Sequence, residues 1–542
     1  MNYKKIGLLL LSVLLVFGLT GCGSNEGEEQ GTVFNYAIGG EPGNLDPATG
    51  SDSVTGFITN QIWLPIYNIG SSGELLPAFA THHEVSDDGL VYTLHFRDDA
   101  YWSDGEQIVA EHVEYAMKRS LAYGTADSYY SYYIGDYVAG AKEYFTNSSK
   151  IADMTDLGVK VVDDFTLEIT LVKPVTYFPT LLTAGVFTPV REDFAPEDDF
   201  LWSDTVGYPT SAAFTPISID RSSEVKMVKN EYFYDKDKVT IDNMNAVIMG
   251  DQNAQLVGFQ TEEIDMATSV DSTVTQVYKD QPELIISDAV ITYYMRLNAA
   301  NNTVNPELAN YNVRRALQLG IDRDNIIKAL NAGDAYYPLH GFIPEGIQGV
   351  SGDFRLEQDA KEKLVYTDKD EAIALLKGEG YTKENPLKVE YYFNENSMHT
   401  TIAQVIQAEL KEINVDLQLK TSDFQVQLES IDNATYSSAR SAMSADYLDP
   451  TTFLSQALLQ NQTVHSWGDQ KYNDLYDEAE HILDPVERLK KLHEVENYIV
   501  KEAAYMVPIM GYSSIYLLDA NVEGVIFNPQ GNCIYWYVKY NN

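Results

Sequence analysis

The stretch WSDGEQIVAEHVEYAMKRSLAY, residues 102–123, carries the strongest fold signal in this chain. Its first four residues, 102–105, predict a turn, because Asp and Gly favour tight turns. Apolar residues then recur every three or four positions from Val113 to Leu121, which is the spacing of one helix face. The stretch therefore predicts a turn that leads into a helix from Ala110 to Tyr123.

Alternating strands flank this helix. Residues 91–96 (VYTLHF) and 166–171 (TLEITL) alternate apolar and polar side chains, as half-buried strands do. Asp163 and Asp164 precede the second strand and provide a turn signal. Strands and helices that alternate in this way predict an α/β architecture.

A second α/β unit is predicted further along the chain. Residues 387–393 predict a strand, apolar residues at helical spacing over 402–413 predict a helix, and 415–419 alternate as a second strand. Two other helices have recognisable starts. Asn312 is suited to cap one of them, and Pro485 fits the first turn of the other.

The N-terminus has the pattern of an export signal. Lys4 and Lys5 precede an apolar run over residues 6–19, which is shorter than the roughly 20 residues needed to span a bilayer. Small residues then lead to Cys22, and this arrangement resembles the lipobox of bacterial lipoproteins, in which the cysteine is acylated. The sequence predicts a signal peptide over 1–21 and a lipidated tether over 22–31; an ordinary secretory signal with a coincidental cysteine is the alternative.

Composition narrows the class of protein. The chain has 542 residues, 44% of them hydrophobic, which is enough for two or more substantial cores. Its 37 basic and 80 acidic side chains give a formal net charge of −43. Such a charge repels phosphate backbones, so nucleic acid is excluded as a partner. The acidic residues are scattered, as on a solvated surface.

Cysteine and histidine give little support for a metal or cofactor site. Cys22 and Cys533 are the two cysteines, and Cys533 is expected to be a small buried hydrophobe. The nine histidines are dispersed, and His82-His83-Glu84 is the one local group. Adjacent residues of a strand point to opposite faces, so these three are not expected to share one ion. The sequence predicts no metal and no cofactor.

The sequence contains none of the enzyme motifs that were considered. No nucleophile elbow, phosphate-binding loop or dinucleotide fingerprint occurs in the sequence, so we expect the protein not to be an enzyme. Tyrosine is abundant, with 38 residues, and residues 129–133 (YYSYY) concentrate it. Tyrosine offers a rigid apolar face with a hydroxyl group, which suits the binding of varied side chains. An ordinary packed aromatic run is an equally good reading.

Six separated stretches resemble the signatures of one family and occur in its order. They are 40–47 (GEPGNLDP), 102–120 (WSDG, then AEHV and KRS), 156–160 (DLGVK), 312–323 (NVRRAL, then GIDR), 341–344 (GFIP) and 445–450 (ADYLDP). Together they resemble the oligopeptide-binding proteins of ABC importers, within the family 5 extracellular solute-binding proteins, a class that also includes dipeptide and nickel binders. The resemblance covers nearly the whole mature chain.

This resemblance implies a two-lobed periplasmic-binding-protein-like α/β fold with a hinge and an extra third domain. Carried onto this chain, lobe I takes residues 32–63, 190–292 and 506–542. The extra domain takes 64–189, and lobe II takes 293–505. Ligand is expected between the lobes as they close.

The resemblance also implies a set of ligand-binding residues. Asp446 matches the family aspartate that binds the peptide amine, although by itself it reads as a turn acid before Pro450. Two positions match residues used at the carboxylate end of the ligand, Arg440 and His399, and His399 would assist best when protonated. The remaining matches are the cleft-lining tyrosines Tyr129 and Tyr294 and the peptide-pairing backbone of Met443 and Ser444.

Some positions depart from the family pattern. Relatives that bridge the positions of Ile291 and Ser444 with a disulfide have cysteines that this chain lacks. Met443 stands where many relatives have tryptophan, and residues 211–214 (SAAF) lack the usual glycine. These differences affect the shape of the pocket and hence the preferred ligand.

The function expected from the sequence is capture of oligopeptides outside the cell and their delivery to an ABC transporter permease. A peptide's backbone can pair with protein strands, which gives affinity that does not depend on its side chains. The protein is expected to be a monomer, held to the membrane by its lipid alone, on a Gram-positive surface rather than in a periplasm. A peptide-pheromone sensor is the first alternative, and nickel or haem binding and an extracellular hydrolase are weaker ones.

Overall fold

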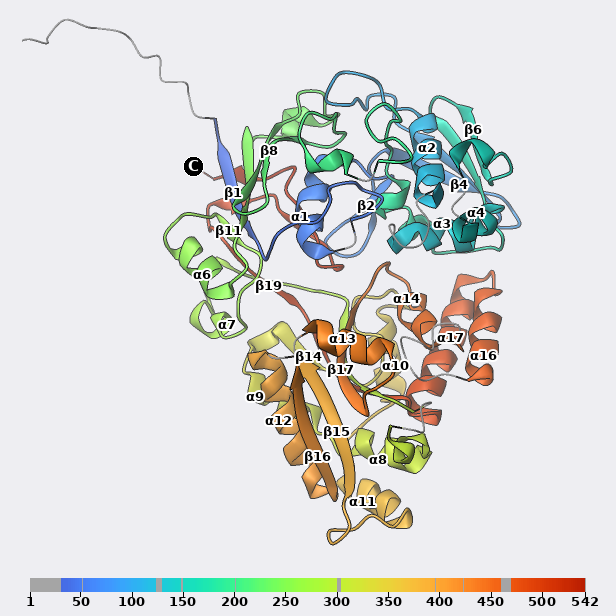
Figure 1. Cartoon of the computed structure of the whole chain (residues 1–542), viewed down its shortest axis with the longest axis vertical. Helices are drawn as coiled ribbons and strands as arrows, with labels where there is room; N and C mark the ends of the chain where they lie inside the picture. Colours follow the sequence, from blue (N-terminus) through green and yellow to red (C-terminus); the bar gives the residue numbers. More distant parts are fainter. Residues whose placement is uncertain are drawn as a thin grey trace, which may run out of the picture.

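The protein consists of two lobes and an extra domain that lies beside the first lobe (Figure 1). The computed structural model describes residues 31–50, 52–122, 129–147, 150–199, 201–299, 304–394, 396–422, 424–459 and 469–541. The predicted signal peptide, Cys22 and all of the predicted tether except Gly31 lie outside the described residues. The two-lobed α/β fold predicted from the sequence is confirmed.

Lobe I is built on a seven-stranded mixed sheet. In sheet order its strands are β12 (Leu284–Ser287), β19 (Ser514–Leu518), β11 (Met266–Ala267), β1 (Val33–Ile38), β10 (Asn243–Ile248), β9 (Glu224–Lys229) and β8 (Phe214–Asp220). The strand β1 is parallel to both of its neighbours, and the remaining pairs are antiparallel. Its helices are α1 (Ser53–Ile62), α6 (Gln252–Gln260) and α7 (Val274–Val277).

The extra domain has a four-stranded antiparallel sheet. Its order is β4 (Ala80–Val85), β5 (Val91–Phe96), β7 (Thr166–Thr170) and β6 (Val159–Asp163). The helices are α2 (Ala110–Ala122), α3 (Tyr132–Tyr137), α4 (Ala141–Asn147) and α5 (Phe178–Leu181), and a short hairpin, β2 (Tyr67–Ile69) and β3 (Leu75–Pro77), precedes the sheet. The strands and the helix predicted around residues 91–171 are confirmed, as is the turn between β6 and β7.

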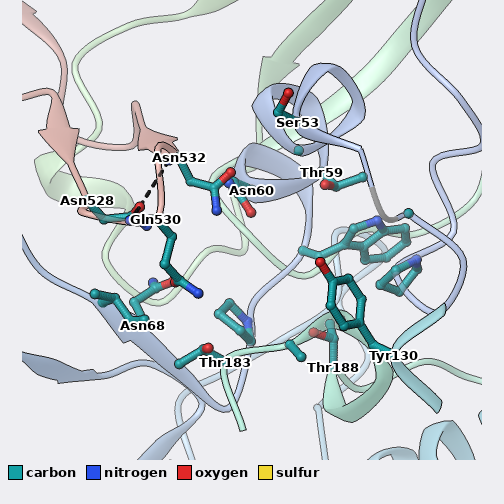
Figure 2. Close-up of a pocket in the computed structure, with 18 of the residues that line it drawn as sticks. Ser53, Thr59, Asn60, Asn68, Tyr130, Thr183, Thr188, Asn528, Gln530 and Asn532 are labelled. Atoms are coloured by element: carbon teal, nitrogen blue, oxygen red, sulfur yellow. Dashed lines mark hydrogen bonds between the residues drawn. The ribbon is translucent and has the colours of Figure 1, made fainter. Parts of the chain in front are cut away.

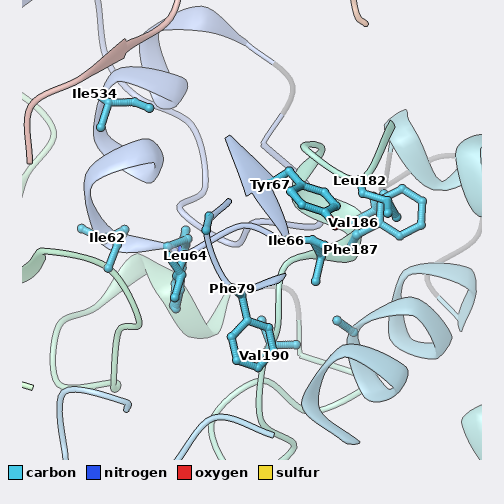
Figure 3. Packing of buried hydrophobic residues seen from close by; sticks show 14 of the residues in the cluster. Ile62, Leu64, Ile66, Tyr67, Phe79, Leu182, Val186, Phe187, Val190 and Ile534 are labelled. Carbon is cyan, nitrogen blue, oxygen red and sulfur yellow. The ribbon is translucent and has the colours of Figure 1, made fainter. Parts of the chain in front are cut away.

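One hydrophobic core runs through lobe I and the extra domain without a break. Phe34 and Tyr36 of β1 belong to the same buried cluster as Leu94 and Met117 of the extra domain. Figure 3 shows the part of this cluster where side chains after α1 meet those of the segment around Val186. Cys533 is fully buried in it, as the sequence predicts. The two units are therefore joined by packing, and together they form one half of the molecule.

Lobe II is built on a six-stranded sheet. Its order is β14 (Tyr336–Pro338), β18 (Met506–Tyr512), β13 (Ile291–Leu297), β17 (Ser438–Ser444), β15 (Leu387–Asn394) and β16 (Val415–Ser422). The predicted strand-helix-strand unit is confirmed, since α12 (Ser397–Glu412) connects β15 to its parallel neighbour β16. The other helices are α8 (Tyr311–Leu319), α9 (Arg323–Leu330), α10 (Phe354–Lys361), α11 (Lys369–Gly378), α13 (Phe424–Asp432), α14 (Thr451–Leu454), α16 (Gln470–Glu480) and α17 (Pro485–Asn497).

The two predicted helix starts have different outcomes. Pro485 is the first residue of α17, where a missing backbone N–H costs nothing, and Asp484 caps the helix. The prediction for Asn312 is wrong, because α8 begins one residue earlier. Asn310 is its cap, and its side chain accepts a hydrogen bond from the backbone N–H of Asn312 at 2.8 Å. Either asparagine suits a cap, so the sequence pattern alone did not decide between them.

The chain crosses between the lobes at two neighbouring places. The strand β12 ends at Ser287 in the sheet of lobe I, and β13 begins at Ile291 in the sheet of lobe II. On the way back, β18 ends at Tyr512 and β19 begins at Ser514. The strand β18, from a segment predicted for lobe I, thus pairs in the sheet of lobe II. Figure 1 shows this thin connection between the halves, the arrangement of a hinge.

Among the described residues, no helix combines the length and the apolar character that a membrane crossing requires.

Candidate functional site

A cavity of about 410 Å³ lies where lobe I, the extra domain and lobe II meet. Polar side chains line it from segments far apart in the sequence (Figure 2). Helix α1 contributes its outer face, the extra domain contributes the segment after α5, and lobe II contributes the end of β17. The lining residues with polar side chains include Ser53, Thr59, Asn60, Asn68, Tyr130, Thr183, Thr188, Ser444, Asp446, Asn528, Gln530 and Asn532.

Asp446 follows β17 and lines this cavity. The hydroxyl of Tyr130 donates to its carboxylate at 3.4 Å, and its backbone N–H donates to Thr452 Oγ1 at 3.1 Å. Burial raises the pKa of the Asp446 carboxyl to about 6, because desolvation disfavours the charged form. Among the described residues no basic side chain forms an ion pair with it. The Asp446 carboxylate is therefore free to form an ion pair with a cationic group of a ligand.

The strand that leads to Asp446 has an open edge. Ser438 and Ala439 of β17 pair with β15, and the pairing between these two strands does not extend to residues 440–444. On the other side, the whole of β17 pairs with β13. Within the described part of the chain, residues 441–444 thus have a strand on one side only. Their side chains are small apart from Met443, which leaves room for another extended chain to approach.

The C-terminal segment contributes three amide side chains that were not predicted from the sequence. Asn528, Gln530 and Asn532 all line the cavity. Asn528 Oδ1 accepts hydrogen bonds from the backbone N–H groups of Gln530 at 3.1 Å and Asn532 at 3.0 Å, which fixes the turn. Gln530 Nε2 donates to the backbone oxygen of Asp446 at 2.7 Å and so links lobe I to lobe II. In the sequence, the polar run NPQGN (residues 528–532) between two apolar stretches could have indicated this loop.

Two predicted residues come together away from this cavity. His399 and Arg440 both lie beside Tyr293: the Tyr293 hydroxyl is 3.5 Å from His399 Nδ1, and the Arg440 guanidinium carbon is 5.5 Å from the ring centroid. Burial, with a contribution from Arg440, lowers the pKa of His399 to about 3. His399 is therefore neutral at physiological pH, whereas it would assist a ligand carboxylate best when protonated. Neither residue lines the 410 Å³ cavity.

The structure places the other predicted residues as follows. Ser444 lines the cavity, and Met443 packs on the core of lobe II. Tyr294 is 1% exposed, stacks edge-on with Phe342 and lies in that same core, because strand alternation turns it to the face opposite Tyr293. Tyr129 begins a short 3-10 helix, and its side chain is outside the described part of the chain.

The register of lobe II places the family's disulfide position where the resemblance implies it. Ile291 of β13 is directly opposite Ser444 of β17 in the antiparallel pairing. Cα atoms opposed in this way are about 4.5–5.5 Å apart, a separation that a disulfide can bridge. The alignment of these two positions is therefore consistent with the strand pairing.

Comparisons with known proteins agree with this architecture. The model for bacterial extracellular solute-binding proteins, family 5 Middle, matches residues 74–464. The oligopeptide-binding protein OppA of Bacillus subtilis is 28% identical over 542 residues, which cover 97% of this chain and 96% of the relative. The dipeptide-binding protein DppE of the same organism is 28% identical over 547 residues, covering 97% of each chain.

A solved structure shows the same fold. The crystal structure of a periplasmic oligopeptide-binding protein (OppAIV) from Borrelia burgdorferi superposes with a TM-score of 0.78 and is 27% identical; the match covers 94% of this chain and all of the other. The family model itself spans well over half of the sequence. The chain therefore belongs to the family 5 bacterial extracellular solute-binding proteins.

Proposed function

We propose that this protein captures peptides in the cavity between its lobes and delivers them to an ABC importer. The observation that carries this proposal is Asp446, a buried carboxylate without a cationic partner among the described residues, at the wall of a partly open polar cavity. The amine of a peptide supplies the missing positive charge. A buried charge is costly unless it is paired, so ligands with an amine in this place are favoured.

The open edge of β17 supports a peptide over other amines. Residues 441–444 lead directly to Asp446 and have no second strand beside them among the described residues. An extended peptide can add to this edge through main-chain hydrogen bonds, with its amine at Asp446. Such bonds are the same for every amino acid, so the protein is expected to accept many sequences.

The charge of the cavity sets a limit to this tolerance. Its lining contains two carboxylates, Asp52 and Asp446, and no basic side chain among the described residues. The remaining polar groups are amides and hydroxyls. Neutral or basic side chains near the amine end are therefore expected to bind better than acidic ones, which would meet negative charge without a partner.

The relatives also inform the cellular role. Their names include oligopeptide- and dipeptide-binding proteins, and the family is extracellular. In this proposal the protein is not an enzyme and works as a monomer held by a lipid on Cys22 at the surface of a Gram-positive cell. It then releases its peptide to membrane permease subunits when the lobes open. The anchor is supported by the sequence before Cys22, and the opening by the two neighbouring hinge crossings.

Mass spectrometry of co-purified ligands tests the proposal. Chains that begin after Cys22 are purified as wild type, Asp446→Asn and Asp52→Asn, and the small molecules released by denaturation are compared. Asp52→Asn is a matched control: it removes one negative charge from the same cavity, and asparagine keeps the cap of α1. We expect mixed peptides from wild type and Asp52→Asn and few or none from Asp446→Asn.

Other outcomes would change the assignment. A single peptide species would support a pheromone sensor. Ligands of another kind, or turnover of added peptides by the pure protein, would contradict capture of peptides for transport. An equal yield of peptides from all three proteins would contradict the role of Asp446 alone.

A further inference from the structure

A second cluster of chemically capable side chains lies on the outer face of the extra domain. Strand alternation places His82 and Glu84 of β4 on one face of the sheet, where both are exposed. His83 points to the other face, where its Nδ1 is 3.0 Å from the hydroxyl of Tyr67. Strand alternation prevents His82, His83 and Glu84 from sharing one ion, but it places His82 and Glu84 on the same face.

The neighbouring strand adds a third residue to this pair. His95 of β5 is directly opposite His82 in the antiparallel register. The two imidazole rings are stacked, with centroids 4.5 Å apart and planes 13° apart. A nitrogen of each ring and a carboxylate oxygen of Glu84 all lie within 4.8 Å of one another. These donors come from two strands, and their proximity is visible only in the fold.

A hydroxyl group sets the proton on His82 in the form that binds metal. The register shifts between Ala80 and His82, so Thr81 has no partner in the ladder. Thr81 Oγ1 lies 3.0 Å from the backbone oxygen of His95, to which it donates its one proton, and 3.0 Å from His82 Nδ1. With that proton on the carbonyl oxygen, Thr81 accepts from His82, and Nδ1 of His82 then carries a proton. The lone pair of His82 then lies on Nε2, and histidine ligands of metals are commonly fixed in this way.

His95 also has a nitrogen available. Its Nε2 is buried and has no hydrogen-bond partner among the described residues. A buried polar nitrogen without a partner is unusual in a folded protein, and a bound ion would satisfy it. Small rotations of the two rings, which the broad χ2 preference of histidine allows, would turn both lone pairs toward one point.

We propose that His82, His95 and Glu84 bind a divalent transition-metal ion of the zinc class. Two imidazole nitrogens and one carboxylate oxygen suit Zn²⁺, and they do not suit Ca²⁺ or Mg²⁺, which prefer oxygen ligands. The fourth position is open to water. The net charge of −43 favours cations near the surface. Because β4 is the outermost strand of its sheet, the ion ties this strand to β5.

The site is separate from the peptide cavity. None of its three ligands lines that cavity. The proposal does not depend on the peptide function. A metal ion bound at this site would stabilise the edge of the extra domain.

Titration calorimetry with ZnCl₂ tests the proposal on the chain that begins after Cys22, with any affinity tag removed. We expect one site in the wild type and at least about tenfold weaker binding for His82→Ala and for His95→Ala. Thr81→Val keeps all three ligands and removes the hydroxyl that orients His82, so we expect an intermediate loss. His83→Ala, on the opposite face of the same strand, is the matched control and should bind like the wild type.

Thermal unfolding gives a second readout. Zinc should raise the melting temperature of the wild type and of His83→Ala, and EDTA should reverse this shift. The two ligand variants should show no shift, while circular dichroism verifies that they fold. Wild-type protein that takes up no zinc, or His82→Ala and His95→Ala proteins that bind as the wild type does, would overturn the proposal.

Discussion

Two aspartates of the sequence signatures form buried ion pairs in the structure. Asp46, from the first signature, accepts bonds from both terminal nitrogens of Arg119 on α2, at 2.6 and 3.1 Å. Both side chains are fully buried, and Trp202 Nε1 donates to the same carboxylate at 2.8 Å. In lobe II, Asp449 forms an equivalent buried pair with Arg488. The signatures therefore include charges that the structure pairs inside the protein.

The Asp46 pair gives a stability prediction. Asp46→Asn leaves the Arg119 guanidinium buried without its charged partner, so we expect a loss of about 3–5 kcal/mol in the free energy of unfolding. Urea unfolding followed by circular dichroism measures it. Asp99→Asn, which removes a surface pair with Arg97, is the control and should have little effect. Equal stability of both variants would contradict the role of the buried pair.

Asp446 gives a prediction for pH. Its raised pKa of about 6 means that the free protein carries a proton there at pH values where an ordinary aspartate is charged. A cationic amine binds the charged form, so binding must release that proton below pH 6. We expect peptide affinity to be highest near pH 7, because the peptide amine itself loses its proton above about pH 8, and to fall by up to about tenfold per pH unit below pH 6. Calorimetry at several pH values should show this slope in the wild type and not in Asp446→Asn.

At the scale of elements, β17 connects the core of lobe II to the cavity. Its first residues are covered by β15, and its last residues leave an edge that ends at the proposed amine site. The same register puts Ile291 opposite Ser444. A strand with one open edge depends on the hydrogen bonds along its other edge. In β17 these bonds are made to β13 along the full length of the strand.

This register predicts where a new disulfide will form. In the chain that begins after Cys22, the double variant Ile291→Cys, Ser444→Cys should form a disulfide that stabilises the protein by about 2–4 kcal/mol. Mass loss on oxidation and urea unfolding with and without reductant measure the two effects. The control pair Ile291→Cys, Ala442→Cys is offset by two residues and is expected to stay reduced. Efficient oxidation of the control pair would contradict the register.

At the scale of the whole molecule, a contact outside the cavity joins the extra domain to lobe II. Glu480 of α16 is 3% exposed, and its carboxylate accepts from Lys173 at 3.0 Å and from the Tyr177 hydroxyl at 3.1 Å. Arg488 of α17 lies over the Tyr177 ring, 4.6 Å from its centroid. In Figure 1, α16 and α17 stand below the extra domain. This contact holds the two halves together on the side away from the hinge.

The contact predicts how fast a bound ligand leaves. Glu480→Gln removes the charge from one buried and one part-buried hydrogen bond across the halves, so we expect peptide to dissociate roughly tenfold faster. Stopped-flow displacement of a fluorescent peptide measures the rate. Glu478→Gln is a matched control on the same helix, because Glu478 pairs with Lys491 inside lobe II. If both variants released peptide at the same rate, the contact would have no part in closure.

The sequence by itself determined the class of fold and several elements within it. Spacing alone predicted α2 and the β15-α12-β16 unit, because the period of apolar residues is a local property that packing preserves. The order of the six signatures indicated the family that the comparisons confirm. The apolar stretch that follows Cys533 also predicted that this residue is buried.

The tertiary structure decided which residues meet. Asp446 was predicted from resemblance, whereas its partner Gln530 comes from 84 positions further along the chain. Tyr294 and Tyr293 look alike in the sequence, and only the sheet shows which face each one occupies. His82 and His95 likewise become neighbours through strand pairing. Contacts between distant segments depend on register and packing, and these are properties of the folded chain rather than of any local pattern.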